Sequence, residues 1–277
     1  MARGKYEHDI FLLSFPKAGR TWLTILLGRA LQLHFGLHKA NPLKLRKLAD
    51  SCPQLPSIFI AHDDRPQWKR PHELSTDKEV YRGKKVIFMV SDPRDLLISN
   101  FFQKKKRITP RKFLFFFHRR RRIKHEPFAG ELPDFLNHDE GGFDTMLRYF
   151  NIWAEKRDVP AEFLCVRYED MKADPARELV KVLEFIGVRG VSDDAIKSAV
   201  EFASFDNMKQ MEKTNALGSS RLRPHDSKDP DSYKVRKGKV GGYADYLTHE
   251  QIDGLNRKMR STLTDFYGYI PNIARSE

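Results

Sequence analysis

Short runs of apolar residues recur along the chain, and each is closed by polar or turn-forming residues. The segments 8–15, 57–62 and 86–90 are dense in isoleucine, leucine, valine and phenylalanine, and 162–171 is an apolar run that ends in polar residues. Runs this short and this apolar are typical of buried β-strands. We therefore predict four strands, each ending at a polar turn.

Helical periodicity follows these strands. Residues 20–35 have apolar positions at helical spacing, which predicts a helix directly after the first strand. Two later helices are predicted from Pro93 onward and over 174–187, because Asp92 and Asp174 each precede a proline. A short carboxylate caps the free amides of a helix start, and proline suits its first position.

Strands that alternate with helices predict an α/β fold, with a central parallel sheet and helices on both faces. We expect a single domain over 1–277. The polar, glycine-containing stretch 206–243 is interpreted as a long loop before a last helix at about 248–266. In such sheets ligands gather at the carboxyl ends of the strands, where Lys17 and His62 fall.

Composition narrows the class of protein. Cys52 and Cys165 are the only cysteines, too few for a disulfide framework and not spaced as metal ligands. The N-terminus lacks the apolar core of a secretion signal, and no run of 18 apolar residues occurs. These features favour a soluble, cytoplasmic protein.

The positive charge is concentrated in one segment. The net charge is +13, and eleven lysines and arginines without any acid lie between Lys104 and Lys124, which leaves +2 for the rest of the chain. We interpret 104–125 as a basic and aromatic insertion within the domain. Three interpretations remain open: a solvated face, a site for an anionic or amphiphilic acceptor or a peripheral membrane contact, and a nucleic-acid patch. The last ranks lowest because no recognition motif accompanies the run.

The segment FPKAGRTW, residues 15–22, leads from the first strand into the first helix. A helix N-terminus beside a lysine favours an anion such as a phosphate or sulfate. The segment lacks the second glycine and the late lysine of the nucleotide-triphosphatase loop, which disfavours magnesium-dependent kinase or ATPase chemistry.

This segment resembles the 5′-phosphosulfate loop of the sulfotransferase superfamily, commonly Y/F-P-K-S-G-T-T-W. Further stretches resemble that family's motifs in the same order, from 11 to about 266: VSDPRDLLIS (90–99), VRYEDM and the helix after it, FASFDNM (202–208) and VRKGKVGGY (235–243). The resemblance implies a fold like that of P-loop NTPases. It also implies transfer of a sulfuryl group from 3′-phosphoadenosine 5′-phosphosulfate (PAPS) to a hydroxyl or amine, without a metal, leaving adenosine 3′,5′-bisphosphate (PAP).

The resemblance implies two catalytic residues. Lys17 would neutralise the bridging oxygen as it leaves, and His62 would accept the proton of the acceptor as its oxygen attacks sulfur. Sulfuryl transfer leaves little covalent work to the protein, so positioning and charge stabilisation carry the rate. Many relatives have a lysine two places before this histidine, where this chain has Ile60.

The resemblance also implies the cofactor-binding residues. The amides at the helix start would hold the 5′-phosphate, and Trp22 and Phe205 would stack on adenine. The full set is Lys17, Ala18, Gly19, Arg20, Thr21, Trp22, Ser91, Ser99, Tyr168, Phe205, Arg236, Lys237 and Gly238.

One of these positions departs from the family pattern. Ser91 stands where the family has an arginine for the 3′-phosphate, and loss of such a charged contact weakens binding by roughly 1.5 to 3 kcal/mol. Either Arg94, Lys237 or a cation of the basic insertion compensates, or cofactor affinity is low. The departure keeps an alternative open, a catalytically weak nucleotide-binding protein of the same fold. The identity of the acceptor and the oligomeric state have no readable signal in the sequence.

Overall fold

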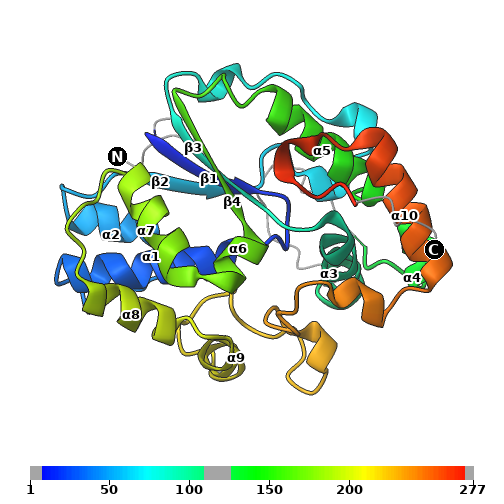
Figure 1. The fold of residues 1–277 in the computed structure, drawn as a ribbon. Coiled ribbons are helices and arrows are strands. Elements are labelled where there is room, and N and C mark those ends of the chain that lie inside the picture. The colour runs from blue at the N-terminus through cyan, green and yellow to red at the C-terminus, as the bar shows by residue number, and fades with distance from the viewer. Residues whose placement is uncertain (1–7, 109–125, 272–277) are drawn as a thin grey trace, which may run out of the picture.

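The computed structural model describes residues 8–108 and 126–271, and within them the chain forms a central sheet of four strands (Figure 1). The strands are β1 (Ile10–Ser14), β2 (Ile58–Ala61), β3 (Lys85–Val90) and β4 (Glu162–Arg167), in the spatial order β2-β1-β3-β4. Each neighbouring pair is parallel. The predicted strands and the parallel sheet are confirmed.

Helices cover both faces of the sheet, as Figure 1 shows. Alternate strand residues point to opposite sides, so Phe11 and Phe88 belong to one core while Leu12 and Ile87 belong to the other. The first core is shared with α3 (Pro93–Lys106), α5 (Phe143–Glu155) and α10 (His249–Thr262). The second is shared with α1 (Arg20–His34), α7 (Pro175–Phe185) and α8 (Asp193–Phe202). The predicted α/β layering is confirmed.

Shorter elements connect these layers. The remaining α-helices are α2 (Leu45–Ser51), α4 (Leu132–Leu136), α6 (Tyr168–Ala173) and α9 (Phe205–Thr214). Single 3₁₀ turns lie at Pro66–Trp68, Pro71–Glu73, Glu79–Tyr81, Pro230–Ser232, Gly242–Asp245 and Asp265–Tyr267.

The two predicted helix starts have the expected caps. The carboxylate of Asp92 accepts a hydrogen bond from the amide of Arg94 at 2.9 Å, and that of Asp174 accepts one from the amide of Arg177 at 2.9 Å. Each satisfies an amide that has no partner inside its helix.

Several predicted boundaries were wrong. The strand predicted over 162–171 ends at Arg167, and helix α6 begins at the next residue. The first part of the loop predicted over 206–243 is instead helical, because α9 extends to Thr214. The Ser204 hydroxyl caps this helix, and its exposed face is mostly polar. The last helix ends at Thr262 rather than near 266.

Candidate active site

The loop between β1 and α1 lies at the carboxyl end of the sheet, and its backbone has an unusual conformation. Lys17 and Gly19 have positive φ angles of 78° and 92°. A side chain at Gly19 would place its Cβ 2.6 Å from the Tyr168 ring, so only glycine allows this approach. No side chain caps α1. The amides of Trp22 and Leu23 donate to the carbonyl of Gly19, which leaves the amides of Arg20 and Thr21 for a ligand.

A cavity of about 460 Å³ opens at this helix start, beyond the carboxyl ends of the strands. Of the residues predicted for the site, it is lined by Lys17, Gly19, Arg20, Thr21, Trp22, His62, Ser91, Ser99, Tyr168, Phe205, Arg236, Lys237 and Gly238. Ala18 does not line it, because its side chain is fully buried in the core behind the loop. The structure thus brings together residues that are far apart in the sequence.

Lys17 points a cationic side chain into this cavity. Burial lowers the pKa of its ammonium group from 10.5 to about 7, and the nearby Arg107 and Arg236 add to the effect while Glu212 opposes it. Among the described residues this ammonium group has no hydrogen-bond or ion-pair partner. A partly desolvated cation without a partner favours an anionic ligand.

His62 is held between the strand end and Arg20. Its Nδ1 lies 2.9 Å from the carbonyl oxygen of Ser14, which only accepts, so Nδ1 carries the proton and donates. Its Nε2 therefore accepts from Nη2 of Arg20 at 2.7 Å, and Arg20 also donates to the carbonyl of Ala61. Burial, followed by the charge of Arg20, lowers the pKa of His62 to about 3. The sequence placed Arg20 at the helix start but did not predict that its side chain would contact His62.

Aromatic rings form another part of the cavity wall. Trp22 meets Tyr168 edge to face, with 5.6 Å between ring centroids. The backbone of Gly238 passes so close to Phe205 that an added Cβ would lie 2.7 Å from the ring. Apolar faces at this position suit a flat purine ring.

The Ser91 hydroxyl already has a partner within the protein. Its hydroxyl donates to Oε1 of Glu169 at 3.2 Å, and the amide of Asp92 donates to the same oxygen at 2.9 Å. Arg94, one of the cations expected to compensate here, does not line the cavity, because it forms a forked ion pair with Asp92 and a 2.7 Å hydrogen bond to Asn256. That alternative is therefore not supported by the structure.

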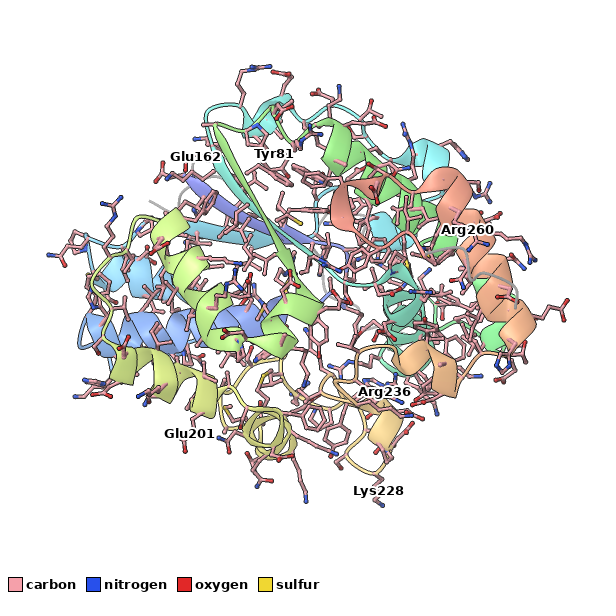
Figure 2. All side chains as sticks on the ribbon, in the orientation of Figure 1. Tyr81, Glu162, Glu201, Lys228, Arg236 and Arg260 are labelled. Atoms are coloured by element: carbon pink, nitrogen blue, oxygen red, sulfur yellow. The ribbon has the colours of Figure 1, made fainter. Side chains whose placement is uncertain are left out.

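Arg236 lies in the segment between α9 and α10, where Figure 2 labels it. Its guanidinium carbon lies 4.1 Å from the ring centroid of Phe102, and it donates to the hydroxyl of Tyr246. Lys237 lines the cavity beside it and pairs with Asp245 at 3.5 Å. Arg236 also pairs with Asp231 at 3.7 Å. Both cations line the same cavity as Ser99, so they could hold a phosphate there if their own partners gave way.

Two carboxylates, the buried Glu212 and the half-buried Asp95, hold this segment in place, and this role was not predicted for either. Glu212 accepts from the amides of Lys234 at 2.6 Å and Val235 at 2.7 Å. Asp95 accepts from the amides of Gly241 at 2.7 Å and of Tyr243 at 2.8 Å. Burial raises the pKa of Asp95 to about 6.

The basic insertion contributes two cations to the cavity that were not singled out from the sequence. Arg107 lines it and pairs with Glu212 at 3.3 Å, and Lys104 lines it with its ammonium 4.9 Å from the ring of Trp68. The rest of the insertion, 109–125, lies outside the described residues, and so does the choice between its three interpretations.

The described residues contain no group of three or more histidine, cysteine, aspartate or glutamate side chains arranged to hold a metal ion. No helix among them is both long and apolar enough to cross a membrane.

Comparison with known proteins agrees with this arrangement. Residues 7–267 match the family model described as "Sulfotransferase domain". Cytosolic sulfotransferase 17 of Arabidopsis thaliana is 26% identical over 272 residues, which cover 90% of this chain and 73% of the relative. The crystal structure of mouse sulfotransferase SULT7A1 complexed with PAP superposes with a TM-score of 0.59 at 22% identity, covering 94% of this chain and 85% of the other.

A retinol dehydratase crystallised with androsterone and the inactive cofactor PAP also superposes. Its TM-score is 0.59 at 17% identity, with 96% of this chain and 82% of the other covered.

Proposed function

The chain belongs to the sulfotransferase domain family, and on this basis we propose that it transfers a sulfuryl group from PAPS to a hydroxyl or amine of an acceptor. The observation that carries the proposal is the cavity at the start of α1, which is lined both by His62 and by Lys17, whose ammonium group has no partner among the described residues. The matched sulfotransferase of mouse was crystallised with PAP, which supports a related ligand here.

The described residues fit such a cofactor. The amides at the start of α1 suit the 5′-phosphate, and Trp22 and Phe205 offer faces for the purine. Ser99, Arg236 and Lys237 suit the 3′-phosphate, while Ser91 is bonded to Glu169. When bound, PAPS supplies the activated sulfuryl group.

Lys17 would act on the leaving side of the reaction. Its ammonium group would neutralise the charge that develops on the bridging oxygen when the bond between that oxygen and sulfur breaks. A cation held in a partly desolvated cavity stabilises this charge more strongly than one in water.

His62 would act on the attacking side. Its Nε2 would take the proton of the acceptor as the new bond to sulfur forms. In the structure the lone pair of Nε2 accepts from Arg20, so this role requires Arg20 to move away first.

The test is transfer from labelled PAPS to a panel of phenols, alcohols and amines. We expect activity to be abolished in Lys17→Ala and to fall by about 10²-fold or more in His62→Ala, while the exposed Lys228→Ala matches the wild type. Full activity in the two site variants would overturn the assigned roles. Absence of PAP binding in calorimetry would overturn the function itself.

A second candidate is a nucleotide-binding protein of the same fold with little turnover. The Arg20 hydrogen bond to His62 favours it, because a base whose lone pair is occupied cannot accept a proton. PAP binding without transfer to any acceptor would support this candidate.

The relatives' names also bear on location. The matched Arabidopsis protein is called cytosolic, which supports the cytoplasmic location expected from the sequence.

A further inference from the structure

A smaller pocket of about 230 Å³ adjoins the cavity on the side of Arg20 and His62. It is lined by Arg20, Thr21, Thr24, Leu43, Ile60, His62, Arg221 and Lys234. Three of these residues are lysine or arginine, and none of the aspartates or glutamates that the structure describes lines the pocket. Lys17, Trp22, Tyr168 and Phe205 line only the larger cavity, so the smaller pocket lies apart from the adenine and leaving-group positions.

The cations of this pocket are not neutralised. Within the described part of the chain, the side chains of Lys234 and Arg221 have no hydrogen-bond or ion-pair partner. Glu212 binds the amide of Lys234 rather than its ammonium group, which fixes the backbone and leaves the charge free. Burial and the nearby Lys17 and Arg20 lower the pKa of Lys234 well below its usual range.

Gathering Arg20, Arg221 and Lys234 without an anion is costly, since the like charges repel one another and burial desolvates Arg20 and Lys234. An anion bound among them would reverse both effects. The pocket is mostly polar, and Leu43 and Ile60 add a small apolar part that an organic body attached to that anion could contact.

We propose that the acceptor is an organic molecule with an anionic group, a carboxylate, phosphate or sulfonate, which binds to Arg20, Arg221 and Lys234 while its nucleophile faces His62. This inference rests on the proposed sulfuryl transfer and names the substrate class of the same site. The acceptor is thus distinguished from a neutral alcohol or phenol by the charges that line its pocket.

The same anion would release the base. Arg20 donates one hydrogen bond to Nε2 of His62 and another to the carbonyl of Ala61. An anion is a stronger acceptor for a guanidinium than a neutral imidazole is, because both partners are then charged. Binding of the acceptor would draw Nη2 of Arg20 away and leave Nε2 of His62 free to accept the acceptor's proton.

The test measures binding of small probes to the full chain saturated with PAP. Benzoate, phenyl phosphate and benzenesulfonate are compared with neutral benzamide by calorimetry. We expect at least one anion to bind about tenfold or more tightly than benzamide. Arg221→Gln should remove that preference, whereas Lys228→Gln, a matched change at an exposed site, should keep it. Which anion binds best distinguishes carboxylate from phosphate and sulfonate.

A second measurement tests whether the anion draws Arg20 away from His62. Carbon NMR of its ring, assigned with His62→Gln, should show the pKa of His62 rising when the preferred anion is added and staying fixed with benzamide.

Each remaining outcome decides against the proposal. Equal binding of all three anions and benzamide overturns it, and so does a preference that Arg221→Gln leaves intact. Anion binding that appears only without PAP shows that these cations belong to the nucleotide's site. Failure of PAP itself to bind is a separate result, which counts against the proposed function and is read before any probe is added.

Discussion

The guanidinium of Arg20 donates to Nε2 of His62 at 2.7 Å, while Nδ1 of the same ring donates to the carbonyl of Ser14. Both ring nitrogens are therefore occupied, and the ring is fixed in one tautomer. Arg20, the first residue of α1, thereby helps to fix the ring orientation of His62 at the end of β2, although 42 positions separate the two residues.

Replacing Arg20 with threonine should restore basicity to His62. We expect the pKa of His62 to rise from about 3 toward 6.5 without reaching it, because burial is the larger cause and remains. Turnover of a neutral phenol near pH 7 should then increase about tenfold, since a base works best with a pKa near the working pH. The pKa is measured by carbon NMR and the rate with labelled PAPS. An unchanged pKa of His62 in Arg20→Thr would contradict the conclusion that Arg20 lowers it.

Nucleotide binding should take up a proton through Lys17. Its pKa is about 7 in the free protein, and a bound phosphate raises it, so at pH 8 a neutral amine becomes an ammonium ion on binding. PAP affinity should therefore fall as the pH rises above 7. Calorimetry in buffers of different ionisation enthalpy measures the uptake. When PAP binds, Lys17→Met should take up fewer protons than the wild type at pH 8 and the same number at pH 5. Equal proton uptake at pH 8 would exclude Lys17 as the group that titrates.

Replacing Gly238 with alanine should weaken nucleotide binding. The new Cβ would lie 2.7 Å from the Phe205 ring and displace it from the cavity wall. Gly218 provides the matched control, because it also has a positive φ but has open space around its Cβ position. Both variants should lose about 1 kcal/mol of stability, whereas only Gly238→Ala should lose about tenfold in PAP affinity. Equal affinities in calorimetry would show that the ring does not contact the nucleotide.

Replacing Glu212 with glutamine should loosen the segment that carries Arg236. A carboxamide presents one oxygen, so either the amide of Lys234 or that of Val235 loses its acceptor in a buried place. We expect the free energy of unfolding in urea to fall by about 1 to 3 kcal/mol. Glu201→Gln, at an exposed helix position that Figure 2 labels, should change it by less than about 0.5 kcal/mol. Comparable losses in the two variants would rule out a bracing role for Glu212.

The sheet could be predicted because each strand contains a short apolar run, and the two central strands, β1 and β3, are buried along almost their whole length. Helix starts at Asp92 and Asp174 could be predicted because their caps act within a few residues. Helix α9 could not, since its polar sequence resembles a loop and its packing through Met208 depends on the rest of the fold.

The site could be predicted only where a motif identified it. The motifs located Lys17, Trp22 and Phe205, all of which line the cavity. The Arg20 contact to His62 depends on side-chain directions that no spacing encodes. The same holds for Arg94, which turns to Asp92 and Asn256 rather than toward Ser91.

The two carboxylates that fasten the segment from Lys234 to Tyr243 also bear on the order in which the chain folds. Asp95 binds amides that lie 146 and 148 positions further along, so this wall closes only when distant parts of the chain have come together. We expect the nucleotide-facing wall to be the last part of the molecule to become organised. Its amides should accordingly exchange with deuterium sooner than those of β1 and β3 in the ligand-free protein.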